Sequence, residues 1–595
     1  MKQIVITLLA TLPIIAAPAQ HNRITSHVDN TRRSTLRGHV HPLALAANDQ
    51  GRADASFQIP RVTLILRPSD AQQADLNQLL AAQQDPTSPN YHKWLTPEEY
   101  ADRFGVGQSD IDQMTTWLQA QNLNVVNVAR ARNSISFSGS AGAVEQAFGT
   151  RIDRYSVDGE LHFANATNPT IPAAFQSVVR SIHGLNDFRM KPKSRPVQAE
   201  YTSLTSTAHY LAPDDISTIY NVRSLYNSGI DGTGMKLVVV GQTRVNLSDL
   251  QQFRTYFNLP ANDPQTMLVP GTRDPGTVRG DLEEADLDLE WAGAIARNAS
   301  ILYVYSRDVM DAVQYAIDQN LAPVLSMSYG QCETLTTTAD AATLRSWAQQ
   351  ANAQGMSWFA ASGDSGGADC YDGSSRSPAG LSVDLPAAIP EVTGVGGTQL
   401  SDSGGSYWNS SNDLNHASAM SYIPEVAWND STNASPSSSG GGASTFFGKP
   451  AWQVGAGVPD ADARSVPDVS LPASPSHDGY LFFTSGKMQV VGGTSAGAPT
   501  FAAIALLLNH YLVLNGAQAA PGLGNMNPRL YSLAAANSSA FHDVTSGNNL
   551  VTACSGRQRL CNSDPVGFSA APGYDQVTGL GSVDAYNLIT GWLAQ

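Results

Sequence analysis

A serine lies in a glycine-rich turn late in the chain, at residues 492–499 (GGTSAGAP). The apolar segment 488–491 before it is expected to be a buried strand, and the apolar segment 500–514 after it is expected to be a helix. The start of a helix supplies free N–H groups and the positive end of a dipole, both of which stabilise an oxyanion. Ser495 is therefore a candidate nucleophile for acyl transfer. The alternative is a tight turn in which Thr494 and Ser495 only cap the helix.

A nucleophilic serine needs a base, and the histidines that follow the N-terminal third of the chain do not suggest one. They are scattered, and none lies in an HGTH-like motif: His209, His416, His477, His510 and His542. A carboxylate base must therefore be considered.

The best candidates for that base lie in residues 281–293 (DLEEADLDLEWAG). On a helix, Glu284 and Asp288 share one face, one turn apart. Two carboxyl groups this close raise the pKa of one of them and share a proton. The alternative is a solvated acidic helix face, but the run continues into apolar residues, which indicates a partly buried helix.

A third acidic residue follows an expected strand over residues 357–361. Asp364 lies in ASGDSGG, at the C-terminal end of that strand, where open parallel sheets place their active sites. An aspartate that only forms a turn is the alternative.

These residues need a scaffold, and the pattern after residue 209 predicts an α/β fold. Strands and helices alternate with short connections, which is typical of a parallel sheet with helices on both faces. We expect strands at 235–240, 300–305, 323–327 and 357–361, and helices at 247–257, 281–297, 308–319 and 341–354. Residues 401–447, rich in Ser, Gly and Asn, are expected to be surface loops.

The N-terminal part has a different organisation. Residues 1–19 have the lysine, apolar run and small residues of a secretory signal peptide, and 20–55 are expected to be a flexible leader. Residues 56–188 have the mixed pattern of an α+β sandwich. Residues 189–208 are a basic, exposed and cleavable linker, and 209–595 form the C-terminal domain.

Composition narrows the function classes further. At 595 residues the chain should contain two or more domains, and a net charge of −16 with a pI near 5.1 excludes nucleic acid as an expected partner. Only three lysines follow residue 201, which suits an acidic medium. Four cysteines fit an oxidising compartment; we expect the pairs Cys332–Cys370 and Cys554–Cys561. The absence of CxxC or paired-histidine spacing disfavours zinc.

Together the motifs resemble the sedolisin family of serine-carboxyl peptidases, and within it the pro-kumamolisin type of precursor. The family's ExxxD motif falls on Glu284 and Asp288, its GDSG motif on Asp364 and its GTSxxxP motif on Ser495. Residues 326–330 (SMSYG) resemble the family's SxSxG substrate-edge strand, with tyrosine where some members carry tryptophan. The resemblance covers almost everything after the signal peptide. It implies a subtilisin-like fold in which a glutamate replaces the histidine base.

The resemblance also implies a role for each residue. Ser495 attacks a peptide carbonyl while Glu284 takes its proton, and Asp288 orients Glu284 and shares its charge. A protonated Asp364 donates a hydrogen bond to the oxyanion. A carboxylate base and a carboxylic acid coexist only near carboxyl pKa values, so activity is expected in acid and should be lost towards neutrality.

Two further sites are implied by the resemblance. Residues 84–97 (QDPTSPNYHKWLTP) are similar to the signature of the family's activation prodomain, which acts as chaperone and inhibitor and is removed at low pH. Asp384 matches a family position near the substrate subsites, where it is expected to favour a basic or polar side chain of the substrate. One structural Ca²⁺ is expected on oxygen ligands of residues near the C-terminus: Asp543, Val544, Ala571, Gly573 and Asp575.

The expected protein is thus a secreted, monomeric, acid-active serine-carboxyl endopeptidase that acts on proteins or peptides, binds its own prodomain, and has no membrane partner. A tripeptidyl exopeptidase of the same family remains open. An esterase is an alternative because residues 493–497 match GxSxG, but the required later histidine is missing unless His542 serves. The last alternative is an inactive binding protein on the same fold.

Overall fold

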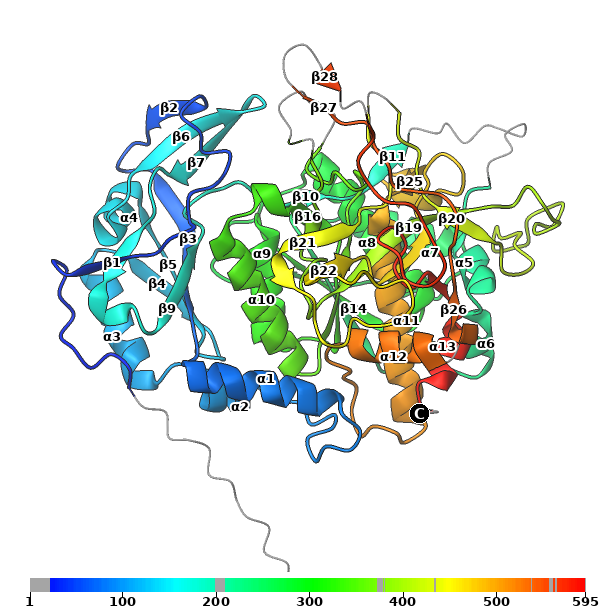
Figure 1. The fold of residues 1–595 in the computed structure, drawn as a ribbon, viewed down its shortest axis with the longest axis horizontal. Coiled ribbons are helices and arrows are strands. Elements are labelled where there is room, and N and C mark those ends of the chain that lie inside the picture. The colour runs from blue at the N-terminus through cyan, green and yellow to red at the C-terminus, as the bar shows by residue number, and fades with distance from the viewer. Residues whose placement is uncertain are drawn as a thin grey trace, which may run out of the picture.

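The computed structural model describes residues 22–197, 209–371, 378, 380–432, 435–536, 538–555, 560–561 and 564–593. The predicted signal peptide and the second half of the predicted linker lie outside these residues. The chain forms two parts, an N-terminal domain coloured blue to cyan and a larger domain coloured green to red (Figure 1).

The N-terminal domain is built on a four-stranded antiparallel sheet, in the order β4-β5-β3-β9. Alternating apolar residues of these strands pack with the helices into one core, which includes Val62, Phe137 and Phe148. The strands are β3 (Gln58–Leu66), β4 (Asn124–Val128), β5 (Ser134–Ser140) and β9 (Val179–His183); the helices are α1 (Asp70–Gln84), α2 (Pro97–Phe104), α3 (Gln108–Ala120) and α4 (Ala141–Phe148). The predicted α+β sandwich is present.

The segment expected to be a flexible leader is instead part of this domain. β1 (Arg33–Thr35) pairs with β8 (Thr170–Pro172), and β2 (Asp49–Arg52) pairs with β6 (Ile152–Val157), which also pairs with β7 (Glu160–Asn165). The side chain of Ile24 is buried in the domain core. The polar composition of this segment hid these contacts, because its strands are short and rest on backbone hydrogen bonds.

The larger domain is organised around an eight-stranded, largely parallel sheet, which confirms the predicted parallel sheet. Its order is β13-β14-β12-β15-β17-β19-β20, with β23 also paired to β19, and every pairing is parallel except that of β20. The strands are β12 (Lys236–Gly241), β13 (Gln265–Leu268), β14 (Ser300–Tyr305), β15 (Val324–Met327), β17 (Ser357–Ala361), β19 (Thr393–Leu400), β20 (Glu425–Ala427) and β23 (Val469–Pro472). Residues 401–447, expected to be loops, contribute β20 and most of β21 (Gly442–Gly448), which pairs with β22 (Ala463–Val466).

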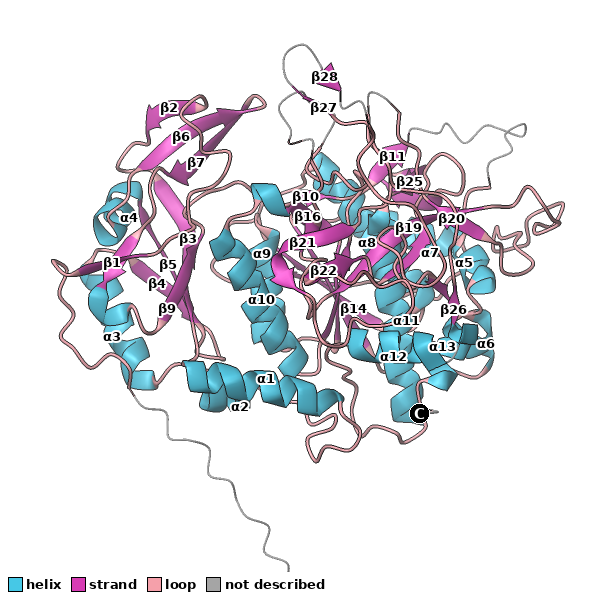
Figure 2. Ribbon diagram, viewed as in Figure 1, coloured by secondary structure: helices cyan, strands magenta, loops and turns pink. Residues whose placement is uncertain are grey.

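Helices cover both faces of this sheet (Figure 2). Val239 of β12 packs in one core with α8 (Arg279–Ile295) and α11 (Thr494–Leu514), whereas its neighbours Val238 and Val240 pack on the other face with α9 (Val309–Asp318) and α10 (Thr338–Ala353). This alternation is the period-two side-chain pattern of a strand buried on both faces. The remaining helices of the larger domain are α5 (Pro213–Ile219), α6 (Arg223–Asn227), α7 (Leu247–Tyr256), α12 (Asn527–Ala536) and α13 (Ala585–Gly591).

The central helix α11 has the length and hydropathy of a membrane span, but it is a core helix. Its apolar window has a mean hydropathy of 1.5, and 83% of that window is buried inside the protein. It begins at Thr494, six residues earlier than expected, so Ser495 lies in its first turn rather than in a preceding loop.

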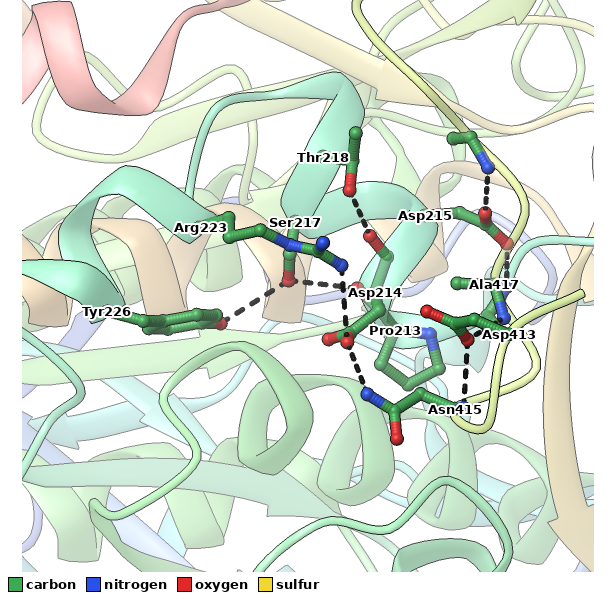
Figure 3. A network of polar contacts seen from close by, with 12 residues as sticks. Pro213, Asp214, Asp215, Ser217, Thr218, Arg223, Tyr226, Asp413, Asn415 and Ala417 are labelled. Atoms are coloured by element: carbon green, nitrogen blue, oxygen red, sulfur yellow. Dashed lines mark hydrogen bonds and ion pairs between the residues drawn. The ribbon is translucent and has the colours of Figure 1, made fainter. Parts of the chain in front are cut away.

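The first helix after the linker is held by a polar network (Figure 3). Asp214 of α5 accepts a hydrogen bond from Asn415 at 2.8 Å and pairs with Arg223, and Asp215 accepts the backbone N–H groups of Ser418 and Ala419 at 2.7 and 2.8 Å. Burial raises the pKa of Asp215 to about 6, although these backbone N–H groups act to lower it. The larger domain thus fixes its own first helix to a surface loop without using the N-terminal domain.

A disulfide joins Cys332 and Cys370, as predicted. The other predicted pair, Cys554 and Cys561, has side chains outside the described part of the chain; their backbones pair between β27 (Cys554–Ser555) and β28 (Leu560–Cys561).

Candidate active site

Ser495 is placed by the glycine that caps α11. Gly493 has a backbone φ of 97°, a left-handed value that residues with a side chain rarely adopt. A Cβ atom at this position would lie 2.3 Å from Asp364 Oδ2. Glycine is therefore required for the close approach of Asp364 to the helix start. Ser495 follows two residues later and is fully buried.

The predicted acidic pair faces this serine from the neighbouring helix. α8 packs against α11, and Glu284 and Asp288 of α8 are fully buried. Ser328, which follows β15, joins the two helices: its hydroxyl donates to Asp288 Oδ1 at 2.6 Å, and its carbonyl accepts from Ser495 Oγ at 3.5 Å. The solvated-face alternative for this helix is therefore wrong.

Burial shifts the titration of both carboxyl groups in the same direction. It raises the pKa of Glu284 to about 8, although the neighbouring Ser495 and Ser194 act to lower it. Burial, and then the charge of Glu284, raises the pKa of Asp288 well above its usual value, against the hydrogen bond from Ser328. The pair therefore keeps at least one proton under conditions in which ordinary carboxyl groups are ionised.

Asp364 lies on the opposite side of the serine turn, three residues after β17. Its Oδ1 accepts the backbone N–H of Thr494 at 2.8 Å and the Thr494 hydroxyl at 2.9 Å. Its Oδ2 faces Gly493, so the carboxyl group lies beside the first turn of α11. The prediction that Glu284, Asp288, Asp364 and Ser495 converge is thus matched by the geometry, whereas the contributions of Ser328 and Thr494 were not anticipated.

A segment of the same chain lies across this site. β10 (Lys191–Pro192) pairs antiparallel with β16 (Tyr329–Cys332), and β11 (Arg195–Val197) pairs antiparallel with β25 (Lys487–Gly492), which also pairs with β24 (Tyr480–Thr484). The described half of the predicted linker is therefore laid into the site rather than exposed. The two strand pairings extend a peptide on both sides of Ser495, which is how a cleft binds an extended chain.

The histidines play no part in this arrangement. His510 lies at the far end of α11, where its Nδ1 accepts the N–H of Gly232, and the ring of His542 stacks on Tyr422 at 3.6 Å. The Ser495 hydroxyl donates to the carbonyl of Ser328, and the acid whose pKa it affects is Glu284. An esterase triad with His542 is therefore not formed.

The two segments that carry the predicted calcium ligands lie against each other. The N–H of Gly573 donates to Asp543 Oδ2 at 2.9 Å, so the two segments are in direct contact. Asp575 braces the turn that follows: Oδ2 accepts from Ala571 and Oδ1 from Val577. All the predicted donors are oxygens, which fits Ca²⁺ chemically. The described residues contain no group of three acidic, histidine or cysteine side chains that could hold a metal ion, so a Ca²⁺ here would depend on backbone carbonyls for most of its ligands.

The comparisons with known proteins cover both domains. Residues 46–188 match the family described as "Pro-kumamolisin, activation domain", and residues 290–520 match the family described as "Subtilase family". The second range contains Asp364 and Ser495 and begins two residues after Asp288.

Individual relatives extend over most of the chain. Kumamolisin of Bacillus sp. (strain MN-32) is 29% identical over 580 residues, 93% of this chain and 95% of the relative. Human tripeptidyl-peptidase 1 is 27% identical over 568 residues, 89% of this chain and 91% of the relative. A solved structure of Pseudomonas sedolisin, a serine-carboxyl proteinase complexed with pseudo-iodotyrostatin, superimposes with a TM-score of 0.52 and 29% identity, over 65% of this chain and 98% of the other.

Proposed function

The chain belongs to the sedolisin family of serine-carboxyl peptidases, and from this premise we propose that Ser495 is its nucleophile, Glu284 the general base, Asp288 the residue that orients Glu284, and Asp364 the donor to the oxyanion. The protein is a serine-type peptidase with its own activation domain. The observation that carries these roles is the buried approach of α8, with Glu284 and Asp288, to Ser495 through Ser328, beneath a peptide segment of the same chain.

The reaction follows from this geometry. Glu284 accepts the Ser495 proton as the hydroxyl attacks a peptide carbonyl, and Asp288, held by Ser328, shares the charge. Asp364 beside Gly493 donates to the developing oxyanion while it is protonated. Glu284 then returns its proton to the leaving amine.

We expect this enzyme to work in acid. The raised pKa values of Glu284 and Asp288 (the acidic dyad) belong to the precursor, in which the linker covers the site and excludes water. When solvent re-enters the cleft of the mature enzyme, the desolvation cost falls and these pKa values move down towards ordinary carboxyl values. The proton that the dyad shares, and that of Asp364, are then lost as the pH rises. Full activity at a pH of about 7.5 would contradict the assigned roles.

Endopeptidase action is favoured because the bound segment continues through strand pairings on both sides of Ser495. The likeness to a tripeptidyl-peptidase favours the alternative, in which only three residues precede the cut. A peptide with an acetylated N-terminus and its free-amine counterpart distinguish the two. Equal cleavage rates support the endopeptidase; strict dependence on a free amine supports the exopeptidase.

The activation domain is proposed to inhibit the peptidase until it is removed. The protein is also proposed to be exported by its signal peptide and to be a monomer in solution. Its linker covers the nucleophile, so a substrate cannot enter before that segment leaves. Residues 20–188, with part of the linker, would be released, and the C-terminal domain would remain.

We further propose one structural Ca²⁺ on the side chains of Asp543 and Asp575 and the carbonyls of Val544, Ala571 and Gly573. When bound, the ion ties the segment after β26 (Phe541–His542) to the turn at 571–575. At a hundredfold excess over its Kd, Ca²⁺ adds about 2.7 kcal/mol of stability. A chelator should therefore lower the melting temperature, and Asp543→Asn should remove that effect, whereas Asp564→Asn on a nearby exposed loop should retain it. An unchanged melting temperature contradicts the site.

The decisive experiment is acidification of the purified precursor from neutral pH to about 4, near reference carboxyl pKa values. Gel mobility and digestion of a denatured protein are followed together. The wild type should lose its N-terminal domain and digest the substrate, while Ser495→Ala and Glu284→Gln should do neither. Glu283→Gln is the matched control, because it makes the same change one residue away on the partly exposed side of α8. An active Glu284→Gln variant would overturn the proposed base.

A further inference from the structure

A second segment of the chain holds the backbone beside Asp364. The N–H of Ser438 donates to the carbonyl of Asp364 at 3.0 Å, and the N–H of Gly440 donates to the carbonyl of Gly363 at 2.7 Å. We call residues 438–441 the support segment. Because these bonds run from backbone to backbone, the position of Asp364 follows that of the support segment.

The support segment lies too close to the backbone before Asp364 to move independently of it. A Cβ atom on Gly440 would lie 2.3 Å from the carbonyl oxygen of Ser362 and 2.7 Å from Gly363 Cα. The hydroxyl of Ser362 also donates to the carbonyl of Gly440 at 2.7 Å. Packing this tight transmits a small displacement rather than absorbing it.

Ser439 connects the support segment to the C-terminal part of the chain. Its side chain is fully buried, and its hydroxyl donates to the carbonyl of Val577 at 2.7 Å and accepts from the N–H of Gly397 in β19 at 2.9 Å. The contact continues along the segment, because a Cβ atom on Gly441 would lie 2.2 Å from the carbonyl oxygen of Gln576. One hydroxyl group therefore joins the support segment both to the central sheet and to a turn 138 positions further along the chain.

The turn that accepts this hydroxyl, residues 575–579 (the C-terminal turn), is itself fixed. Asp575 Oδ1 accepts the N–H groups of Val577 and Thr578 at 2.9 and 2.8 Å. Ser470 of β23 donates its hydroxyl to the carbonyl of Thr578 at 3.0 Å, and β23 pairs with β19 in the central sheet. The C-terminal turn is therefore a fixed point against which the support segment is held.

We propose that Ser439 is a positioning residue for the oxyanion donor: its hydroxyl fixes the support segment to the C-terminal turn, and the support segment fixes Asp364. This inference rests on the proposed role of Asp364 as that donor. The part of the chain after Ser495 thus contributes to the reaction, although it carries none of the proposed reacting groups.

Ser439→Ala breaks this connection without changing a reacting group. It leaves the N–H of Gly397 and the carbonyl of Val577 buried without their hydroxyl partner, so the support segment loses its attachment to the turn. Asp364 is then displaced together with the segment. Because an oxyanion forms only in the transition state, a displaced donor should lower kcat and leave KM nearly unchanged.

The first test measures kcat and KM of the acid-processed enzymes on one peptide that the wild type cleaves. Ser439→Ala should lower kcat roughly tenfold or more, since a small misplacement in an active site is costly. If its precursor does not fold, Ser439→Cys is measured instead, because a thiol keeps the size of the side chain but forms weaker hydrogen bonds. The same split between kcat and KM is expected. A kcat equal to that of the wild type, or a loss confined to KM, overturns the inference.

The matched control is Ser470→Ala, the same change at another fully buried serine that donates to the C-terminal turn. Its backbone N–H still donates to the carbonyl of Gly581 at 3.0 Å, so the turn stays attached to β23. Ser470→Ala should lower the melting temperature and leave kcat nearly unchanged. Equal losses of kcat in Ser439→Ala and Ser470→Ala would show that any weakening of the turn lowers activity, and this result also overturns the inference.

The second test asks whether Ser439 acts through Asp364. Ser439→Ala is combined with Asp364→Ala, and precursors that do not process themselves are first cleaved by immobilised wild-type enzyme, which is then removed. The double variant should be as slow as Asp364→Ala alone, because the position of a missing group has no effect. Losses that multiply overturn the inference alone. If Asp364→Ala is as active as the wild type, the proposed role of Asp364 has failed, and the inference fails with it.

Discussion

At the scale of single residues, the Glu284–Asp288 dyad depends on Ser328, which belongs to neither α8 nor α11. Ser328 donates to Asp288 and accepts from Ser495, so it connects the acidic pair to the nucleophile through one residue. Its hydrogen bond lowers the pKa of Asp288, against the larger effects of burial and of the charge on Glu284. Ser328 therefore positions the pair and also adjusts its titration.

Replacing Ser328 by alanine should move the pH profile as well as the rate. Loss of a hydrogen bond to a charged group costs about 1.5–3 kcal/mol, so kcat/KM should fall roughly tenfold or more. Because the lost bond favoured the ionised form of Asp288, its pKa rises and the alkaline limb of kcat/KM shifts to higher pH.

The control for this variant is Ser326→Ala, the same change at a buried serine two residues earlier whose hydroxyl has no hydrogen-bond partner among the described residues. Ser326→Ala should leave the alkaline limb of the kcat/KM profile unchanged. If Ser328→Ala lowers the rate without shifting that limb, then Ser328 has only a packing role.

At the scale of elements, α8 carries a second set of buried acids on a different face. Glu290 Oε2 accepts the backbone N–H of Phe483 at 2.9 Å, and Asp286 lies near Thr484, so this face contacts the β24 strand. Burial, and then the charge of Asp286, raises the pKa of Glu290 well above its usual value. The helix is thus compatible with neutral carboxyl groups and disfavours charged ones.

This arrangement predicts that the fold itself is an acid-stable one. Burial raises the pKa of Asp286 to about 8, and the nearby Thr484 hydroxyl only partly offsets this shift. The contribution of protonated Asp286 to stability is fully present below the unfolded-state pKa of this group. It is lost as the pH rises through the folded-state pKa of about 8.

Asp286→Asn should therefore add about 2 kcal/mol to the free energy of unfolding at a pH of about 7.5 and almost nothing at about 4. Denaturant unfolding of the Ser495→Ala precursor with and without the substitution measures the difference. Asp460→Asn, the same change at an exposed aspartate of the larger domain, serves as the control. An equal effect at both pH values would contradict a titration effect.

At the scale of the whole molecule, the activation domain is held by more than its linker. His183 of β9 contacts Asp308 at the start of α9 and Asp340 in the first turn of α10, at 3.3 and 3.2 Å, and Arg61 of β3 pairs with Asp311 at 2.9 Å. The sheet of the activation domain therefore faces these two helices, and α1 also contacts α10 along its side (Figure 1).

The histidine contact should be strongest in the acid range. Burial lowers the pKa of His183, but the hydrogen bonds and charges of Asp308 and Asp340 raise it well above its usual value overall. Burial acts to raise the pKa values of the two aspartates, but the hydrogen bond and charge of His183 outweigh it and bring both pKa values below their usual range. The histidine contribution is complete below a pH of about 6.5 and is lost as the pH rises through its raised pKa; the aspartate contributions are complete above about 3.8 and are lost at lower pH.

His183→Gln in the Ser495→Ala precursor should cost about 1–3 kcal/mol at a pH near 5.5, a decrease of several degrees in melting temperature. The decrease should shrink near pH 3, where the aspartates protonate. His27→Gln, at an exposed histidine of the same domain, is the control. A loss that is constant between these pH values would contradict the charged contact. Because the contact persists in acid, cleavage of the linker, rather than acid alone, is required to free the peptidase.

The features that could be predicted are local ones. The i, i+4 spacing of Glu284 and Asp288, the glycine turn before Ser495 and the strand before Asp364 depend on residues that are neighbours in the chain, and the periodicity of the buried strands and helices depends on the same short range. The start of α11 was misplaced because small residues and a proline within its first turns mask the helical pattern. The leader was misassigned because its strands rest on backbone pairing with partners over a hundred residues away.

The sequence alone therefore determined the reactive residue types, their local spacing and the domain order of this protein. Only the tertiary structure decided that Lys193 of the linker meets Asp369 and Asp384. These residues come from segments separated by nearly two hundred positions, and no spacing rule relates them. Their meeting depends on two strand pairings, one disulfide and the packing of α8 on α11, and such contacts form only when the whole fold brings distant segments together.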